Sequence, residues 1–173
     1  MRYTKSILMS AVTAATILWG SAAFGQDQSA KDFVNKATIA GKTEVILARL
    51  ALKNSQADDV HTFAKQMIKD HGEANVQLAS IAKSKNLSVP AHIDAKHRAV
   101  VESLRTQTGA AFDAAYAKQM VADHEEAVAL FKSAASANMD PDLGAFAQKT
   151  LPTLEHHKSM ADALAAQHTS GAQ

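Results

Sequence analysis

Apolar residues recur along the chain at the three- and four-residue spacing of amphipathic helices, and short polar stretches separate the runs. In the first run, Phe33, Ala40 and Leu47 fall on one helical stripe. The pattern predicts four long helices and one short one. The long helices are expected at about Ala30 to Leu52, after Ser55 to about Lys85, after Thr108 to just before Asn138, and Pro141 to about Ala166. The short helix is expected at about Ile93 to Leu104.

Residues at the ends of these runs support the boundaries. Ser55 followed by Asp58 is typical of a helix N-terminus, and so is Asp140 followed by Pro141. Pro90 disfavours helix at the residue before it, which places a loop between the second long run and the short one. Since most connections are short, we expect neighbouring helices to be antiparallel. The pattern thus predicts an all-α antiparallel four-helix bundle with one additional short helix.

The first 25 residues have the organisation of a signal peptide. Arg2 and Lys5 are basic, an uncharged apolar run follows from Ile7 to Trp19, and Ala23-Phe24-Gly25 suits signal peptidase. A retained membrane anchor is the alternative, but the run is shorter than the roughly 20 residues that span a bilayer. We therefore expect cleavage after Gly25 and a periplasmic or otherwise exported protein.

The mature chain, residues 26–173, has the size of a single domain, whose bundle core we expect at about residues 30–167. Without Arg2 and Lys5 its formal charge is −1, and no basic patch remains, so nucleic acid is not an expected partner. No second apolar run predicts a transmembrane segment. Because the chain contains no cysteine, packing alone must hold the fold, and soft-metal chemistry must use methionine and histidine.

A nine-residue motif occurs twice, in the second and third long helices. Phe63-Ala-Lys-Gln-Met-Ile-Lys-Asp-His71 matches Tyr116-Ala-Lys-Gln-Met-Val-Ala-Asp-His124 at an offset of 53 residues, and ten of 21 aligned residues are identical. Duplication of a helical hairpin for packing explains the apolar matches. It does not explain the repeated Asp-His pair, since neither residue is a usual core filler.

The chain resembles a family of domains of unknown function, the one numbered 4142. The resemblance rests on the two Met-x-x-Asp-His motifs, on Gly109-Ala-Ala-Phe-Asp113 and on Thr150-Leu-Pro-Thr-Leu-Glu-His-His157, and it covers roughly Phe33 to Leu164. Members of this family are secreted, ferritin-like and often described as outer-membrane proteins. The resemblance therefore implies a ferritin-like bundle and export, and it carries over no settled activity.

One ionisable residue of each long helix falls on the apolar stripe when the helix is projected at about 100° per residue. Glu44 lies on the stripe of the first helix, His71 on that of the second, His124 on that of the third and His157 on that of the last. Each long helix is thus predicted to direct one charged or metal-ligating side chain towards a common interior.

Two arrangements would satisfy such buried polar groups. In the first, Glu44 accepts hydrogen bonds from histidines in a neutral network that fixes the helix register. In the second, the four side chains bind a metal ion, as inward carboxylates and imidazoles do in ferritin-like bundles. The paired Glu-x-x-His motifs of a di-iron site are missing, so copper or zinc is favoured over iron. Four further candidate ligands lie at four-residue spacings on these helix faces: Met67, Met120, His156 and Met160.

Several other polar residues are predicted to lie outside the interior. Asp70 and Asp123 directly precede inward histidines and so point about 100° away from them. They are either hydrogen-bond partners for the inward residues of a neighbouring helix or solvated, and periodicity alone favours the solvated position. Pro152 interrupts the last helix and leaves the carbonyl of Gln148 without its helical partner. Four histidines near helix ends are expected at the surface: His61, His92, His97 and His168.

The sequence lacks a glycine-rich phosphate loop, a cysteine nucleophile and a serine elbow. The activity is not settled by the sequence: one hypothesis is an exported bundle that binds a transition metal through its inward residues, while helical packing by itself favours a structural role for them. The alternative is a non-catalytic envelope stress or scaffold protein, peripherally associated with the envelope, whose buried polar residues are structural. A small-molecule enzyme would need a pocket among the helices that the sequence does not reveal.

Overall fold

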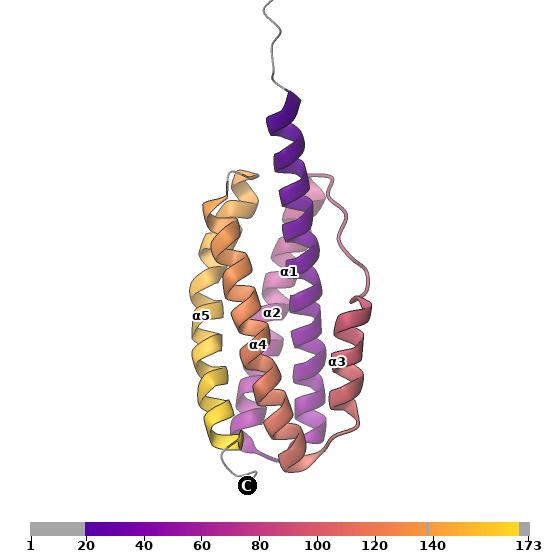
Figure 1. The fold of residues 1–173 in the computed structure, drawn as a ribbon, viewed down its shortest axis with the longest axis vertical. Coiled ribbons are helices and arrows are strands. Elements are labelled where there is room, and N and C mark those ends of the chain that lie inside the picture. The colour runs from indigo at the N-terminus through magenta and orange to yellow at the C-terminus, as the bar shows by residue number, and fades with distance from the viewer. Residues whose placement is uncertain (1–19, 138, 170–173) are drawn as a thin grey trace, which may run out of the picture.

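The computed structural model describes residues 20–137 and 139–169, and within them it contains five α-helices and no strand. The helices are α1 (Gly20–Asn54), α2 (Asp58–Ser84), α3 (Ala95–Arg105), α4 (Gly109–Ser136) and α5 (Pro141–Thr169). The four long helices pack side by side, and the short α3 lies outside them, against α1 and α4 (Figure 1). The predicted all-α four-helix bundle with one additional short helix is confirmed.

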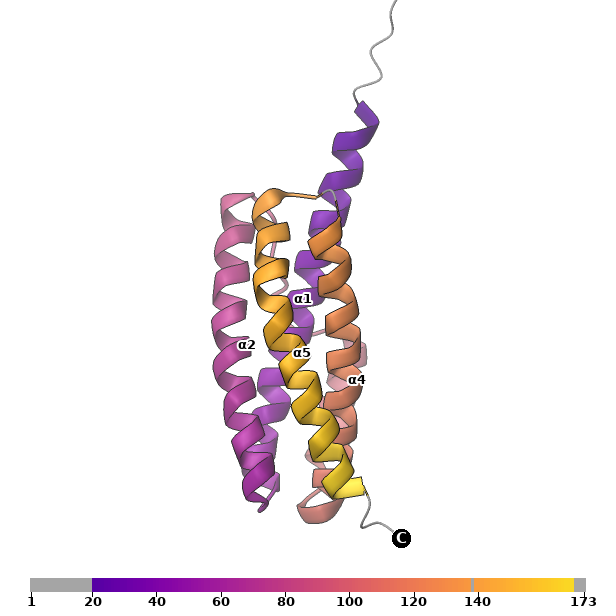
Figure 2. The same cartoon turned by 90° about the vertical axis from the view of Figure 1, so that its left-hand side faces the viewer.

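The long helices follow the order α1, α2, α5, α4 around the bundle, so that α2 and α4 stand at opposite corners (Figure 2). The segment of residues 85–108, which contains α3, returns along the bundle before α4 begins (Figure 1). As a result, α2 and α4 run in the same direction, and every neighbouring pair of long helices is antiparallel. One such long crossover is typical of ferritin-like folds.

The first helix begins earlier than the sequence pattern predicts, at Gly20 instead of near Ala30. The intervening residues include several alanines and no proline, so nothing in them stops the helix. The first turns of α1 extend beyond the ends of the other helices (Figure 1). Residues 1–19 of the predicted signal peptide lie outside the described residues, and none of the described helices could cross a bilayer on its length and hydropathy.

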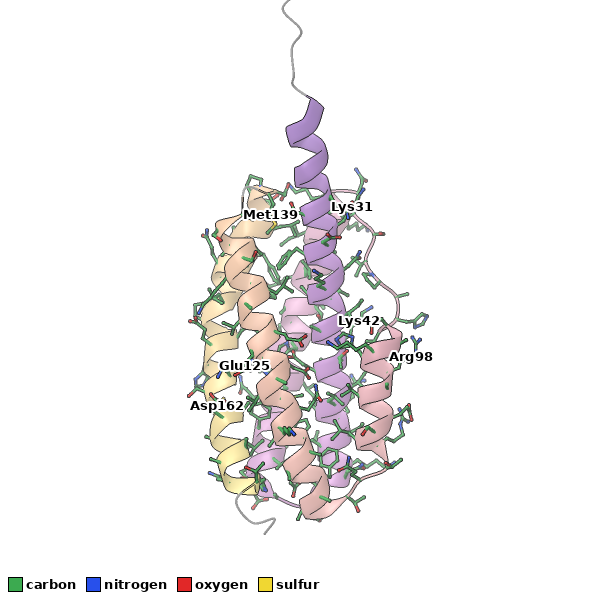
Figure 3. The ribbon with its side chains drawn as sticks, viewed as in Figure 1. Lys31, Lys42, Arg98, Glu125, Met139 and Asp162 are labelled. Atoms are coloured by element: carbon green, nitrogen blue, oxygen red, sulfur yellow. The ribbon has the colours of Figure 1, made fainter. Side chains whose placement is uncertain are left out.

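Side-chain contacts to backbone carbonyls attach the crossover to α1. Lys42 Nζ donates to the carbonyl oxygens of Pro90 at 2.5 Å and Ala91 at 3.1 Å, and Asn54 Nδ2 donates to that of Gln107 at 2.8 Å. Figure 3 shows Lys42 beside the part of α3 that carries Arg98. These contacts hold α3 along the outer face of α1.

The core consists of two apolar clusters. One contains Phe33, Phe131 and Phe146, whose ring centroids lie 5.2–6.4 Å apart. The other contains Phe63 and Tyr116 with centroids 6.1 Å apart, and includes the N-terminal parts of α2 and α4. Along each long helix, one buried ionisable residue lies between the members of the two clusters: Glu44, His71, His124 and His157. A polar layer therefore crosses the interior of the bundle.

Pro152 lies inside α5, as the sequence predicts. Because proline lacks an N–H group, it leaves the carbonyl of Gln148 without its helical partner. Figure 2 shows that α5 changes direction about halfway along its length, so the helix bends and continues instead of ending.

Two glycines, one on α1 and one on α2, differ in the space that a side chain would have. A Cβ atom on Gly41 would overlap Asn75 Oδ1 of α2, whereas a Cβ atom on Gly72 would have no neighbour within 4 Å. We expect Gly72→Ala to raise the free energy of unfolding by about 1 kcal/mol, because alanine is the better helix former. We expect Gly41→Ala to give a smaller gain or a loss, since Asn75 must move.

Urea denaturation of both variants in the presence of chelator measures this difference, and Asn75→Ala serves as the background control. In that background Gly41→Ala should stabilise the protein as Gly72→Ala does. Equal gains of the two single variants in the wild-type background would contradict the tight approach at Gly41.

Candidate metal centre

Four buried polar side chains, one from each long helix, meet in the layer between the two apolar clusters. They are Glu44 of α1, His71 of α2, His124 of α4 and His157 of α5, and their exposed fractions lie between 0 and 6 %. Helical periodicity predicted all four to point inwards, and the structure confirms this. The layer is therefore the part of the molecule where buried ionisable chemistry is concentrated.

The three imidazole rings form a compact triangle. Ring centroids lie 5.6 Å apart for His71 and His124, 5.3 Å for His71 and His157, and 5.5 Å for His124 and His157. One nitrogen from each ring can be chosen so that all three lie within 4.8 Å of one another. Among the described residues, His71 Nε2, His124 Nε2 and His157 Nδ1 have no hydrogen-bond partner.

The other nitrogen of each ring is bonded outwards. His71 Nδ1 donates to Glu44 Oε2 at 2.7 Å, and His124 Nδ1 donates to the carbonyl oxygen of Met120 at 2.8 Å. His157 Nε2 donates to Asp70 Oδ2 at 2.9 Å. Each of these bonds fixes which nitrogen carries the proton, and in a neutral ring it leaves the lone pair on the opposite nitrogen. The unpartnered nitrogens are thus the ones available to the shared interior.

Glu44 and His71 are held as a charged pair. Burial alone would raise the pKa of Glu44, but the surrounding histidines, His71 foremost, outweigh it and lower the pKa to about 2. Burial alone would lower the pKa of His71, but the Glu44 carboxylate outweighs it and raises this pKa above its usual value. These two shifts favour carboxylate and imidazolium, so a metal ion held at Nε2 would displace a proton.

The remaining two histidines favour the neutral state. Burial lowers the pKa of His157 to about 4, and its hydrogen bond to Asp70 offsets only part of the effect. Burial also lowers the pKa of His124, with Glu44 opposing this shift and His71 adding to it. Two of the three rings are therefore ready to act as lone-pair donors at neutral pH.

The prediction that Asp70 is exposed to solvent is wrong. Its Oδ2 accepts hydrogen bonds from His157 Nε2 at 2.9 Å and from Gln66 Nε2 at 2.5 Å. Burial would raise its pKa, but these two hydrogen bonds outweigh it and lower the pKa. The residue before an inward histidine points sideways, and in a four-helix bundle the sideways direction faces the next helix instead of water.

Asp123 is likewise not solvated. Its Oδ1 accepts a hydrogen bond from Gln119 Nε2 at 2.8 Å, while its Oδ2 is buried without a partner in the described part of the chain. Burial first, and then the Glu44 carboxylate, raise its pKa to about 6. The sequence contained a signal for both aspartates, because each copy of the repeat has a glutamine four residues before the aspartate.

The additional candidate ligands lie beside the layer or outside it. Met67 and Met120 are fully buried in the apolar cluster around Phe63, and Met160 packs against the same cluster. His156 is exposed, with its ring centroid 6.5 Å from that of His157. The three methionines therefore contribute to packing next to the histidines, and His156 points away from them.

The histidines predicted at the surface lie near it. His92 is exposed, and the other three are half-buried with partners close in sequence or at the bundle end. His61 contacts the Ser55 carbonyl oxygen at 3.1 Å, and His97 contacts Asp94 Oδ1 at 2.7 Å. None of these histidines joins the buried triangle, as far as the described residues show.

Known proteins similar to this chain share its fold. The profile of the family DUF4142, a domain of unknown function, matches residues 20–164. No curated protein sequence matches the chain significantly. A DUF305 fragment from Deinococcus radiodurans is similar in structure, with a TM-score of 0.71 and 17% identity over 80% of this chain and 96% of that chain.

A second similar structure is a DUF305 protein from Streptomyces coelicolor, designated a candidate secreted protein. Its TM-score is 0.69, with 12% identity over 82% of this chain and 94% of that chain. At such identities the likeness establishes the fold alone. It agrees with the ferritin-like helical bundle seen in the helix order and in the long crossover.

The lowered pKa of His157 predicts an acid-sensitive core in the metal-free protein. Between about pH 6.5 and 4, His157 binds more protons in the unfolded chain than in the folded chain, so its contribution to the free energy of unfolding must fall as the pH is lowered through this window. The raised pKa of Asp123 acts in the opposite direction below about pH 6, so the contribution of His157 is read from the difference between the wild type and a variant without this ring. A shift from 6.5 to about 4 corresponds to roughly 3 kcal/mol. Urea denaturation at a series of pH values with chelator measures the loss.

The matched variants for this measurement are His157→Gln and His156→Gln. His157→Gln removes the titrating ring and retains a donor for Asp70, so it should flatten the pH dependence. His156→Gln changes the exposed neighbouring residue and should leave the wild-type profile. A steep loss that persists in His157→Gln would show that another group titrates.

Proposed function

The chain belongs to the DUF4142 family, a domain of unknown function, and we propose that it is an exported protein that binds one transition-metal ion between His71, His124 and His157. The observation that carries the proposal is the buried triangle of rings, each bonded outwards through one nitrogen and unpartnered at the other within the described structure. Copper or zinc is the preferred ion, and iron is less favoured.

A metal ion resolves a specific conflict in this layer. Three buried nitrogens lack a hydrogen-bond partner among the described residues, and each such group loses its hydration without compensation. A single cation accepts all three lone pairs at once. The three histidines form the preferred nitrogen donor set for copper or zinc, and the layer supplies neither the thiolates of a structural zinc finger nor the several carboxylates of a di-iron site.

The groups behind the rings are of the kind that orient metal ligands. Glu44 behind His71 and Asp70 behind His157 are carboxylates that receive the outer N–H of a ring, and the carbonyl of Met120 does so for His124. Such partners fix ring orientation and make the imidazole a better donor. The Glu44 carboxylate also offers negative charge near a bound cation.

The burial of the centre supports a function in holding an ion over one in turnover of a substrate. All three histidines are almost inaccessible to solvent. Three nitrogen ligands would leave room for a further ligand, which a water molecule or a neighbouring methionine would supply. The proposed role is therefore storage, buffering or delivery of the metal in the exported compartment.

A structural role for the polar layer is the competing proposal. The hydrogen bonds from His71 to Glu44 and from His157 to Asp70 connect α2 to α1 and to α5 without any metal. In that case the protein is a scaffold or stress protein of the envelope, and the layer only specifies the helix register. Metal analysis separates the two proposals.

Export rests on the sequence of residues 1–25 and on two further observations. The first turns of α1 project beyond the bundle, so cleavage after Gly25 would leave the packed part of the helices intact (Figure 1). The similar protein from Streptomyces coelicolor is itself designated a candidate secreted protein.

Metal content is the decisive test. Protein without a histidine tag, purified from the exported fraction of the cells that make it, should contain copper or zinc in one-to-one stoichiometry. Its intact mass should correspond to a chain that begins at Gln26. The variant His71→Ala/His124→Ala should lose the metal, since only one ligand remains, while circular dichroism still reports a helical protein. Chelator should lower the melting temperature of the wild type, because a ligand of the native state stabilises it.

The control variant is His61→Ala/His156→Ala, which removes two histidines outside the layer and should retain the metal. If the double alanine variant of the layer does not fold, the single conservative variant His124→Gln takes its place. A metal-free wild type that also fails to take up copper and zinc in titration would overturn the proposal and leave the structural role.

Asp70→Asn tests the orienting role of the outer carboxylate. Loss of its negative charge weakens the hold on the His157 N–H, so we expect metal affinity to fall by about 10- to 100-fold. Glu73→Gln removes a carboxylate from an exposed position of the same helix and should change the affinity little. Metal affinity is measured by competition with a chelator of known affinity. Equal effects of the two substitutions would show that Asp70 contributes only its negative charge and does not orient His157.

A further inference from the structure

The two sides of the histidine layer differ in how their carboxylates are used. Asp70 and Asp123 occupy equivalent positions in the repeat, and each accepts a hydrogen bond from a glutamine four residues before it. Asp70 also receives the N–H of His157 from the neighbouring α5. Asp123 receives no such donor within the described structure, and its Oδ2 is buried and unpartnered.

The neighbour of Asp123 on α1 is another carboxylate with a free oxygen. Glu44 is almost completely buried, and its Oε1 has no hydrogen-bond partner among the residues described. Its Oε2 binds His71, and Oε1 lies 3.8 Å from His124 Nδ1. The α1–α4 side of the layer therefore presents two unused carboxylate oxygens, where the α2–α5 side has a complete carboxylate–imidazole pair.

A pocket of about 530 Å³ opens at these two carboxylates. It lies between α1, α4 and the N-terminal end of α3, and both Glu44 and Asp123 line it. Two basic side chains of α3 in its lining already have carboxylate partners, since Lys96 pairs with Glu126 at 3.5 Å and His97 contacts Asp94 at 2.7 Å. The remaining one, Lys36, is exposed to solvent. The free carboxylate oxygens thus stand at the buried end of the pocket.

The opposite side of the layer is less well prepared for a cation. A smaller pocket of about 170 Å³ lies between α2 and α5 and is lined by Asp70. The Oδ2 atom of Asp70 is engaged by Gln66 and His157, so a cation arriving there would have to displace both donors. Of these two pockets, the one at Glu44 and Asp123 is the better prepared for a positive ion.

We propose that the pocket between α1 and α4 is the route by which the metal ion reaches and leaves the histidines, with Glu44 and Asp123 as an oxygen-lined transit position at its inner end. The inference rests on the proposed function. An ion entering the protein loses water ligands, and carboxylate oxygens replace them favourably. Glu44 then adjoins both the pocket and two of the rings, so the ion passes from oxygen to nitrogen ligands over a short distance.

The test times zinc uptake and release by competition with a chromogenic chelator, in the full mature chain. Ala40 lines the pocket one turn before Glu44, and Ala40→Phe should obstruct the route. An obstruction slows association and release by a common factor and leaves the affinity unchanged, which a mere structural disturbance would not do. Asp123→Asn should slow association by about ten-fold, because it removes the attracting charge.

The matched control is Ala74→Phe, which places the same bulk in the pocket between α2 and α5 and should leave both rates unaltered. If Ala40→Phe does not fold, Ala40→Leu replaces it. Wild-type rates in the obstructed variant, or slowing by Ala74→Phe instead, would overturn the route while leaving metal binding in place. Failure of the wild type to bind zinc or copper would overturn the proposed function itself, and the route with it.

Discussion

A buried carboxylate in the middle of the bundle imposes the strongest constraint on the rest of the structure. An ionised side chain in an apolar core requires hydrogen-bond donors and compensating positive charge, and Glu44 obtains both from His71 at 2.7 Å, with His124 nearby. Because Glu44 belongs to α1 and these histidines to α2 and α4, satisfying it fixes how far those helices can slide or rotate against α1. A slip by one turn would place an apolar side chain opposite the carboxylate.

The same constraint divides the core into two apolar clusters with a polar layer between them. Replacing such a layer with apolar side chains is often neutral or stabilising in proteins, so its presence indicates a gain in specificity or in ligand binding. The layer has a closed side, where Asp70 and His157 complete each other, and an open side, where Asp123 and Glu44 face a pocket. The proposed entry of an ion from one side only depends on this difference.

Helical periodicity was sufficient to predict the bundle and the four residues of the layer, because each of them lies on a long apolar stripe. It failed for Asp70 and Asp123, since a projection of one helix cannot show that a neighbouring helix covers its flank. The repeated glutamine before each aspartate carried that information, but only the structure shows its partners. The start of α1 was missed for a different reason: the residues before Gln26 were assigned to a predicted signal peptide, and nothing in residues 20–29 stops a helix.

The crossover between α2 and α4 affects the order in which the bundle interior folds. Contacts within the α1–α2 pair and within the α4–α5 pair are local in sequence, whereas contacts between the pairs span the whole chain. Local pairings form first in helical proteins, because closing a long loop costs more entropy. Two residues of the layer belong to each pair, so we expect the triangle of rings to assemble only when the two hairpins dock. Occupancy by an ion would then report that folding is complete, and a chain whose two hairpins have not docked would carry none.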